Sequence, residues 1–372
     1  MSNPPSTLGG RTRIVFAAGG TAGHVEPALA TADKVRELHP NADIVFLATK
    51  TGIENQLVPA RGYELLTVPK AVLPRRISKD LALLPLRLIR AVVVTKRALS
   101  GADVVVGFGG YLAGTAYLAA WISRIPIVVH EANVKAGLAN KLGSLLTNKV
   151  ALVDARARLR GGVVIGLPMR KSIIFWAEKA NGDLSACQTE ARSALHLELD
   201  KPTLLVIGGS QGSMQINAAV AQALDELIAN GIQILHAVGG RNELPEAKSG
   251  YFPTSYLDKI EIAYAAADLL IARSGAATCQ EAIAFGLPAV LVPLSHGNGE
   301  QALNADALVE AGAAMIIRDD LFNGDVLFIR SNEILRDDNL RKRMRSASKG
   351  LARVGAATEL AQIVTNAVSG LN

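Results

Sequence analysis

The chain has 372 residues, of which 49% are apolar and only 4% aromatic, and its 39 Lys and Arg against 33 Asp and Glu leave a formal net charge of +6. This apolar content excludes an intrinsically disordered chain, and the length suits two domains of ordinary size. The 34 glycines and few aromatic residues favour an α/β protein with glycine turns over an aromatic-rich β-sandwich.

Cysteines and apolar runs bear on the location of the chain. Cys187 and Cys279 belong to no Cys-x-x-Cys motif or Cys/His cluster, so neither a disulfide framework nor a structural zinc site is indicated. The apolar run 14–18 is too short for the core of a signal peptide, which predicts a cytoplasmic chain. Residues 104–122 carry no charge, but their glycines predict a buried strand, a turn and a helix rather than a membrane span.

Short β-branched runs alternate with Ala- and Leu-rich stretches, which predicts βαβ units and parallel sheets. The strands expected in the first half are Arg13–Ala17, Asp43–Leu47, Val104–Gly107, Ile127–His130 and Lys149–Val153. Those expected in the second half are Thr203–Ile207, Gln233–Ala237, Leu269–Ala272, Ala289–Pro293 and Ala314–Ile317. Each half opens with a strand that runs into a glycine turn, so we expect two tandem Rossmann-like domains, 1–167 and 168–372, with the last helix able to pack back on the first.

Three glycine turns follow predicted strands, at Gly19–His24, Gly107–Tyr111 and Gly208–Ser213. Such a turn between a parallel strand and a helix places backbone N–H groups and the positive end of the helix dipole together, which favours an anion. A tight turn without a ligand is the alternative for each one. No turn has the dinucleotide spacing G-x-G-x-x-G, and the chain has no G-x-x-x-x-G-K-[ST] loop, which argues against a kinase or ATPase site.

A formal G-x-G-x-x-A at Gly297–Ala302 supports an alternative function. A nicotinamide-dependent oxidoreductase would use this turn for the cofactor pyrophosphate and Asp319 for a ribose hydroxyl. The usual fingerprint, however, lies in the first strand-to-helix turn of its domain.

A dense polar cluster, Arg273–Glu281, directly follows a predicted strand. Ser274 and Thr278 can cap a helix there or donate to phosphate oxygens, while the N–H groups of 275–278 bind the same anion. Glu281 can accept both hydroxyls of a ribose, or it can complement the helix dipole as an ordinary acid of the first turns. The spacing leaves both readings open.

Four separated motifs together resemble the MurG family: Gly19–His24, His130–Asn133 with Ala136–Leu138, Gly208–Gly212, and Arg273–Ala276 through Glu281. They occur in the family's order and at similar spacings, from about Arg13 to Asn304. The family comprises peptidoglycan enzymes that transfer N-acetylglucosamine from UDP-GlcNAc to lipid I, giving lipid II. The resemblance implies the glycosyltransferase B fold, two Rossmann-like domains facing a cleft. A UDP-GlcNAc 2-epimerase, another lipid-directed transferase and a binding protein without turnover remain alternatives.

The resemblance implies that UDP-GlcNAc is bound mainly by the second domain. The diphosphate would lie between the Ser210 turn and the start of the helix after Ser274, the ribose on Glu281 and the uracil near Leu257. Glu300 departs from a Gln-Gln pair that contacts the sugar in the family. The implied donor residues of this domain and its junction are Arg170, Ser210, Gln211, Leu257, Arg273, Ser274, Ala276, Ala277, Thr278, Glu281, Gln301 and Asn304.

The first domain would supply the acceptor side. The resemblance places acceptor phosphates at Gly20, Gly109, Gly110 and Tyr111, and it places Thr21, Ala22, Gly23 and Asn133 against the transferring donor sugar. Ala22 and Ala132 replace a glycine and a glutamine that are usual in the family.

The implied mechanism is an inverting displacement in which the C4 hydroxyl of the lipid-linked MurNAc attacks the anomeric carbon and UDP leaves. It needs a general base and an electrostatic cradle for the diphosphate. His24 is the candidate base because imidazole titrates near working pH, although a His at a helix start can equally donate to a phosphate. The helix dipole, N–H groups and Arg170 would do the work of a metal, so neither a metal nor a cofactor is predicted.

A stretch from Val72 to Arg90 mixes apolar and basic residues, as membrane-interface segments do, with each Lys or Arg contributing about 1 kcal/mol near an anionic surface. A loop and helix of the domain core is the alternative for its leucines. The chain is expected at the cytoplasmic face of the cell membrane, and no basic stripe interleaved with aromatics predicts nucleic acid. The expected membrane residues are Arg75, Arg76, Lys79, Leu81, Leu84 and Trp121.

Overall fold

The computed structural model describes residues 12–70, 79–209, 211–295 and 299–370. It divides into two compact units, each described by itself below. Unit 1 contains the chain up to Arg170 and again from Arg353 onward, whereas unit 2 contains Lys171–Ala352. The structural division therefore follows Arg170 rather than residue 167, and the carboxyl-terminal helix belongs to unit 1.

Unit 1 is built on a parallel sheet in which seven described strands have the order β3-β2-β1-β4-β5-β6-β7. The inner strands β1, β2, β4 and β5 are almost entirely buried because helices cover both faces. The strands are β1 (Arg13–Ala17), β2 (Asp43–Ala48), β3 (Glu64–Thr67), β4 (Val104–Gly107), β5 (Ile127–Glu131), β6 (Val150–Leu152) and β7 (Gly162–Val164).

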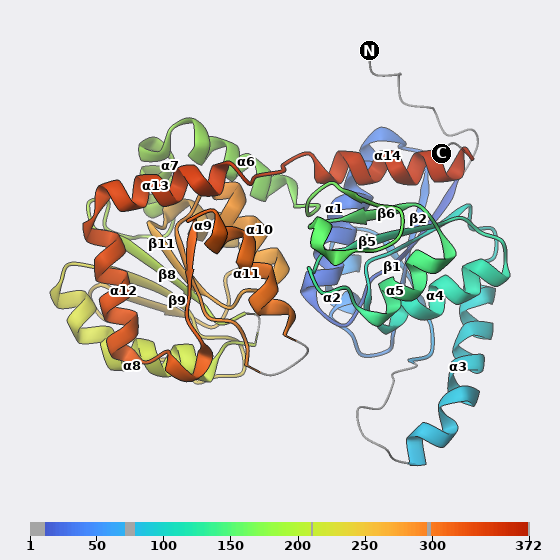
Figure 1. The fold of residues 1–372 in the computed structure, drawn as a ribbon, viewed down its shortest axis with the longest axis horizontal. Helices are drawn as coiled ribbons and strands as arrows, with labels where there is room; N and C mark the ends of the chain where they lie inside the picture. The colour runs from blue at the N-terminus through green and yellow to red at the C-terminus, as the bar shows by residue number, and fades with distance from the viewer. Residues whose placement is uncertain (1–11, 71–78, 210, 296–298, 371–372) are drawn as a thin grey trace. The chain divides into compact units, whose positions relative to one another are not determined.

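Helices cover the two faces of this sheet (Figure 1). One face packs on α1 (Ala22–Leu38), α2 (Glu54–Ala60) and the carboxyl-terminal α14 (Ala356–Val368). The opposite face packs on α3 (Lys79–Ala98), α4 (Gly110–Ile122) and α5 (Leu138–Leu146). The buried ring of His39, after α1, lies with Nε2 3.0 Å from Thr365 Oγ1, which joins α1 to α14.

Unit 2 is built on a second parallel sheet, whose six described strands have the order β10-β9-β8-β11-β12-β13. The strands are β8 (Thr203–Ile207), β9 (Gln233–Ala237), β10 (Tyr251–Thr254), β11 (Leu269–Ala272), β12 (Ala289–Leu291) and β13 (Ala314–Ile316). Its helices are α6 (Lys171–Gly182), α7 (Leu184–Ala194), α8 (Met214–Ala229), α9 (Ile260–Ala266), α10 (Ala276–Phe285), α11 (Glu300–Glu310), α12 (Gly324–Arg336) and α13 (Asp338–Lys349). Helices α8, α12 and α13 pack against one face of this sheet and form a hydrophobic core with it.

The expected fold class is confirmed, since both units are Rossmann-like parallel sheets alternating with helices. All ten predicted strands are present, and where their bounds differ they do so by one or two residues. The strands that the sequence did not predict are β3, β7 and β10, and all three lie at sheet edges. Edge strands are covered on fewer sides and so lack continuous apolar runs, and β10 also contains Pro253.

Residues 104–122 form β4, a turn and α4, as the glycines predicted. Among the described residues, no helix has both the length and the apolar content that a membrane span requires. Cys187 and Cys279 are buried and form no disulfide.

Gly166 lies where the last part of the chain meets β7 within unit 1. Its φ is +91°, and a Cβ atom there would lie 2.8 Å from the Arg353 Cβ. We expect Gly166→Ala to lower the free energy of unfolding by roughly 1–3 kcal/mol, since both the backbone conformation and the space favour glycine. Denaturant unfolding measures this change. Gly182→Ala, at the end of α6 with nothing within 4 Å, is the matched control and should be neutral or stabilising; equal losses in the two variants would contradict the explanation.

Candidate functional site

In each sheet, two neighbouring central strands have connections that leave in opposite directions. In unit 1, β1 pairs with β2 on one side and with β4 on the other. In unit 2, β8 pairs with β9 on one side and with β11 on the other. No crossover helix covers the carboxyl ends of strands at such a reversal, which makes it the usual ligand site of an open α/β sheet.

The predicted motifs occupy these two reversals. The turns Gly19–His24 and Gly107–Tyr111 follow β1 and β4 in unit 1. The turn Gly208–Ser213 and the cluster Arg273–Glu281 follow β8 and β11 in unit 2. Four segments that are distant in the sequence thus form two pairs, one at the carboxyl edge of each sheet. Each unit therefore offers one candidate binding edge.

His24 joins the two turns of unit 1. Its Nδ1 lies 3.3 Å from the carbonyl oxygen of Gly19 and 3.3 Å from Thr21 Oγ1. Gly109 has a φ of +91°, and a Cβ atom there would lie 3.3 Å from His24 Nε2. A side chain at Gly109 would therefore press on the imidazole, and glycine at this position lets the two turns meet around the His24 ring.

The protonation of His24 suits proton acceptance. Burial lowers the pKa of His24 below its ordinary value of 6.5, while the bond to Gly19 and the Glu131 carboxylate oppose that shift. A carbonyl oxygen can only accept, so the contact with Gly19 assigns the ring proton to Nδ1 and the lone pair to Nε2. At neutral pH the imidazole is then uncharged, with a nitrogen able to act as a general base.

A buried carboxylate shapes the loop after β5. Glu131 accepts hydrogen bonds from the backbone N–H and side-chain amide of Asn133, at 2.9 and 3.3 Å, and from Gly137 N and Asn140 Nδ2, both at 3.0 Å. Tyr117 in turn donates to Asn140 Oδ1 at 2.8 Å. Glu131 belongs to a motif that the sequence shows, but its role follows from the structure, where it orients Asn133.

His130 supports the same region from within the core. The residue is 1% exposed, its ring centroid lies 5.2 Å from that of Phe108 with the planes tilted by 40°, and its Nε2 donates to the carbonyl of Gly166 at 3.3 Å. Burial lowers the pKa of His130 to about 4, with His24 contributing in the same direction and the Gly166 bond opposing it. A neutral His130 therefore links β5 to the segment that follows β7.

The four expected acceptor-phosphate residues differ in their surroundings. Gly109 caps α4, and Gly110 and Tyr111 begin it, so their N–H groups belong to the unpaired first turn of the helix. Gly20 N instead donates to the carboxylate of Glu54 at 3.3 Å. The Gly20 N–H therefore already has a buried acceptor, and the place of Gly20 at the acceptor phosphate stays a prediction. Glu54 is not among the site residues predicted from the sequence.

The turn after β8 rests on the loop after β9. Gly212 has a φ of +77°, and a Cβ atom there would lie 2.0 Å from the Val238 carbonyl oxygen. Asn242 Nδ2 donates to the carbonyls of Gln211 at 3.0 Å and Val238 at 2.7 Å. Residues 238–242 form a further glycine-containing turn, which is not among the three predicted from the sequence. Ser210, one of the expected donor residues, lies outside the described residues.

Arg273 has an internal role. Its guanidinium donates to the carbonyl of Val292 at 3.0 Å, to Asp319 Oδ1 at 2.6 Å and to Ser213 Oγ at 2.7 Å. These bonds tie β11 to the ends of β12 and of the turn after β8. Asp319 is therefore an ion-pair partner of Arg273, which argues against the ribose role that an oxidoreductase would give it. Residues 297 and 298 of the corresponding G-x-G-x-x-A lie outside the described residues.

The start of α10 leaves its N–H groups uncapped by side chains. Gly275 is the N-cap residue, and neither Ser274 nor Thr278 caps the helix, so of the two roles considered for their hydroxyls the capping role is absent. Ser274 is fully buried, and its Oγ has no hydrogen-bond partner within the part of the chain that the structure describes. Ala276, Ala277 and Thr278 form the first turn. This geometry matches an anion site made by backbone donors.

Side chains around α10 have defined partners. Tyr264 of α9 donates to Glu281 Oε2 at 3.0 Å, which fixes the carboxylate, and Asn304 Nδ2 lies 3.5 Å from the Ser274 carbonyl. Gln301 Oε1 accepts from Leu294 N at 2.9 Å. Glu300 is the first residue of α11, where a carboxylate complements the helix dipole. In unit 1, Arg170 Nε lies 3.7 Å from Glu26 Oε2.

The chain matches two family models, the glycosyltransferase family 28 N-terminal domain over residues 14–152 and the family 28 C-terminal domain over residues 203–360. The chain belongs to glycosyltransferase family 28. It is therefore a sugar-transferring enzyme, and each of the two candidate sites lies within one of the two matched domains.

Curated relatives and solved structures agree with this family. The UDP-N-acetylglucosamine–N-acetylmuramyl-(pentapeptide) pyrophosphoryl-undecaprenol N-acetylglucosamine transferase of Corynebacterium diphtheriae is 44% identical over 96% of this chain and 97% of its own length. The Streptomyces coelicolor protein of the same name is 44% identical over 96% and 98%. The crystal structure of Acinetobacter baumannii MurG is 26% identical in sequence, with a TM-score of 0.74; the match covers 95% of this chain and 99% of that one. A calicheamicin glycosyltransferase, 18% identical with a TM-score of 0.65 over 97% and 99%, shares the fold.

The buried histidines predict how stability varies with pH. Burial lowers the pKa values of His130 and His236 to about 4 in the folded chain, whereas the unfolded residues titrate near 6.5. As the pH falls, the unfolded chain therefore takes up these protons before the folded chain does. The free energy of unfolding has its full value above pH 6.5 and decreases between pH 6.5 and 4, by about 3 kcal/mol for each histidine. NMR titration of the imidazole resonances measures the two pKa values, and ordinary values near 6.5 would contradict the burial described here.

Proposed function

We propose that this chain transfers N-acetylglucosamine from UDP-GlcNAc to the C4 hydroxyl of MurNAc in lipid I, giving lipid II and UDP. The observation that carries the proposal is the pairing of an uncapped helix start with Glu281 at one sheet edge and of two glycine turns with His24 at the other. The first combination suits a nucleotide diphosphate with its ribose, and the second suits proton removal from a hydroxyl. The relatives at 44% identity are named for this transfer.

The donor side is assigned to unit 2. The N–H groups of Ala276, Ala277 and Thr278, together with the turn at Gln211, bind the diphosphate through backbone donors and the α10 dipole. Glu281, held by Tyr264, accepts the ribose hydroxyls. Arg273 acts indirectly, by fixing the turns that surround the diphosphate. Leu257, Gln301 and Asn304 keep the roles that the family resemblance implies, against the uracil and the sugar.

The acceptor side and the chemical step are assigned to unit 1. The MurNAc C4 oxygen attacks the anomeric carbon while the bond from that carbon to the diphosphate oxygen breaks. The hydroxyl proton passes to His24 Nε2, and UDP carries away the bonding electron pair. Asn133, with Thr21, Ala22 and Gly23, contacts the transferring sugar, and Gly109, Gly110 and Tyr111 contact the acceptor phosphates. Arg170 can exchange its partly exposed Glu26 partner for a phosphate because ion pairs open to solvent contribute little.

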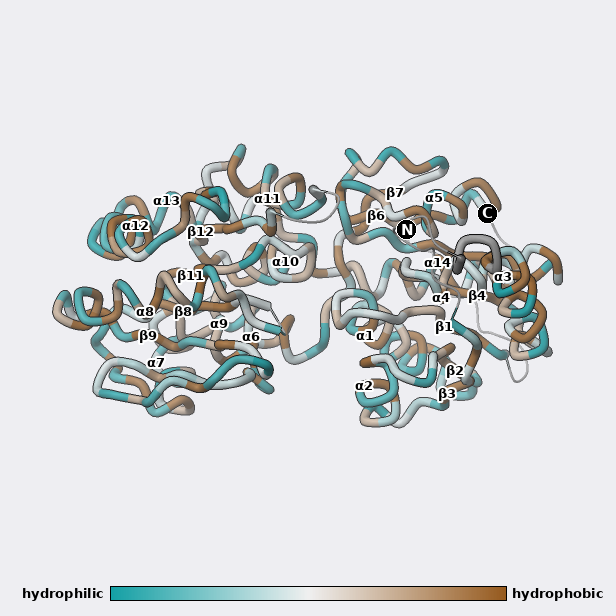
Figure 2. The backbone as a smooth tube through the Cα atoms, turned by 90° about the horizontal axis from the view of Figure 1, so that it is seen from below, coloured by the Kyte–Doolittle hydropathy of each residue, from teal (hydrophilic) through white to brown (hydrophobic). Residues whose placement is uncertain are grey.

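We also propose that unit 1 binds the cytoplasmic face of the cell membrane. On α3, the side chains of Leu86, Ile89 and Val93 are 66%, 61% and 45% exposed, and their spacing puts them on one face of the helix. Arg87 and Arg90 are exposed beside them, and Figure 2 shows hydrophobic and hydrophilic residues intermixed along α3. Of the expected membrane residues, Leu84 is half-buried, while the side chains of Arg75, Arg76, Lys79 and Leu81 lie outside the described residues.

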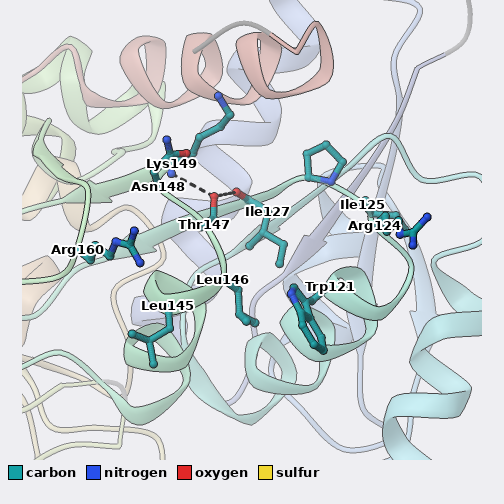
Figure 3. Close-up of a pocket in the computed structure, with 11 residues that line it drawn as sticks. Trp121, Arg124, Ile125, Ile127, Leu145, Leu146, Thr147, Asn148, Lys149 and Arg160 are labelled. Carbon is teal, nitrogen blue, oxygen red and sulfur yellow. Dashed lines mark hydrogen bonds between the residues drawn. The ribbon is translucent and has the colours of Figure 1, made fainter.

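A second apolar and basic surface lies at the amino end of β5, where a surface cavity of about 600 Å³ opens. Trp121, 59% exposed, and Leu145, 69% exposed, line it with Arg124, Lys149 and Arg160 (Figure 3). This edge is opposite the carboxyl ends of the strands, so the cavity is separate from the site at His24. Exposed Trp and Leu beside basic groups suit a membrane interface, which supports Trp121 as a second anchor.

A transfer assay tests the proposed reaction. Labelled GlcNAc transfer from UDP-GlcNAc to a lipid I analogue is measured with EDTA present, for the unchanged chain and for Glu281→Ala. We expect transfer by the former and a loss of about 10- to 100-fold in kcat/KM for the latter, because hydrogen bonds to a charged group are lost. Glu333→Ala, an exposed carboxylate on α12, is the matched control. Absence of product while UDP-GlcNAc still binds would refute the acceptor and favour a UDP-GlcNAc 2-epimerase or a binding role.

A vesicle-binding experiment tests the membrane proposal. We expect the double variant Leu86→Ser with Ile89→Ser to bind phosphatidylglycerol vesicles at least about tenfold more weakly, since it removes two exposed apolar side chains. Val354→Ser, which changes an exposed apolar residue elsewhere in unit 1, is the control. Co-sedimentation gives the affinities. Unchanged binding by the double variant would remove α3 from the membrane surface.

A further inference from the structure

Glu54 is a buried carboxyl group that the proposed reaction has not used. It is the first residue of α2, directly after the loop that follows β2, and it is 0% exposed. Within the described residues it takes part in no salt bridge. Burying an unpaired carboxylate is costly unless hydrogen bonds satisfy it. Its retention in the core of unit 1 therefore calls for donors close by.

Three donors converge on the Glu54 carboxylate. Oε1 accepts from the backbone N–H of Thr49 at 3.2 Å and from the Thr49 hydroxyl at 3.1 Å. Oε2 accepts from the backbone N–H of Gly20 at 3.3 Å. The first pair anchors the carboxylate to the end of β2. The third bond reaches across to the turn between β1 and α1, so one side chain joins two strand ends.

The surrounding glycines leave room for this carboxylate. A Cβ atom at Gly52 would lie 2.0 Å from both Glu54 oxygens, so a side chain there would displace the carboxyl group. One at Gly19 would lie 2.4 Å from Leu112 Cδ1 and 3.3 Å from Glu54 Oε1, so it would clash with the leucine and press on the carboxyl group. Glycine at both positions thus leaves the space that Glu54 occupies.

The same turn orients the candidate base. The Gly19 carbonyl belongs to the same peptide group as the Gly20 N–H that donates to Glu54, and it accepts from His24 Nδ1. Thr49 Oγ1 also lies 3.3 Å from the Tyr111 hydroxyl, at the start of α4. Movement of the Gly19–Gly20 peptide would therefore turn the imidazole and loosen the contact with the second glycine turn.

We propose that Glu54 is a positioning residue, which holds the Gly19–Gly20 turn and through it the His24 imidazole in the orientation that accepts the acceptor's hydroxyl proton. This inference rests on the proposed function for its catalytic consequence. It assigns Glu54 no contact with either substrate.

Glu54→Gln is the sharpest test because it preserves size and shape. All three partners are donors, and a glutamine side chain has one accepting oxygen, so its NH₂ group must face a backbone N–H of Thr49 or Gly20. The variant therefore loses at least one bond while filling the same space. Glu64→Gln, an exposed carboxylate on the neighbouring strand β3, is the matched control.

Steady-state transfer kinetics give the first result. We expect Glu54→Gln to lower kcat about 10- to 100-fold, because a misplaced base stabilises the transition state less. The affinity of unit 2 for UDP should stay unchanged within about twofold. Glu64→Gln should match the unchanged chain. A kcat within twofold of normal for Glu54→Gln would overturn the proposal, as would an equal loss of UDP affinity.

An NMR titration of His24 gives a result that does not depend on transfer. A released turn exposes the imidazole, so its pKa should rise toward 6.5 in Glu54→Gln, while Glu131 and His130, the titratable groups that act on it, stay in place. If the His24 pKa is the same in Glu54→Gln as in the chain without the substitution, the positioning role is refuted. This holds even if the chain without the substitution transfers no sugar. If Glu54→Gln does not fold, Thr49→Val, which removes only the hydroxyl donor, should shift the His24 pKa in the same direction; no shift would overturn the proposal.

Discussion

A parallel sheet whose chain reverses direction at its centre cannot cover the carboxyl ends of the two strands at that point. In this protein the reversals lie between β1 and β4 and between β8 and β11. The exposed ends are followed by glycine turns and helix starts, whose N–H groups have no partner inside the helix. Both candidate sites follow from this constraint, because each consists of the two segments that emerge at one reversal.

Two buried carboxylates and one partly buried guanidinium hold these turns in place. Glu54 fixes the turn after β1, Glu131 fixes the loop after β5, and Arg273 joins the turns of unit 2. Each charged group is satisfied by several hydrogen bonds rather than by solvent. These bonds make the loss of solvent tolerable and hold the side chain in one orientation. The residues that contact substrate in the proposed mechanism therefore depend on polar groups that themselves contact none.

The sequence predicts the inner strands well because burial on both faces demands continuous apolar runs, as in Val104–Gly107. It misses the edge strands β3, β7 and β10, whose side chains are partly exposed. It also finds the glycine turns, which are local signals. It gives no role to Glu54 and does not predict the ion pair of Arg273, because these contacts depend on partners brought close by the sheet, Gly20 and Asp319, which lie 34 and 46 positions away.

The central claim is that the two reversals have separate tasks, with the nucleotide bound at the edge of unit 2. Hydrogen exchange of the full chain with and without UDP, followed by mass spectrometry of its peptides, tests this claim most directly. The account predicts slower exchange in peptides covering 208–214 and 273–285, with the turn at 19–24 unchanged. Protection confined to the turn at 19–24 would contradict it.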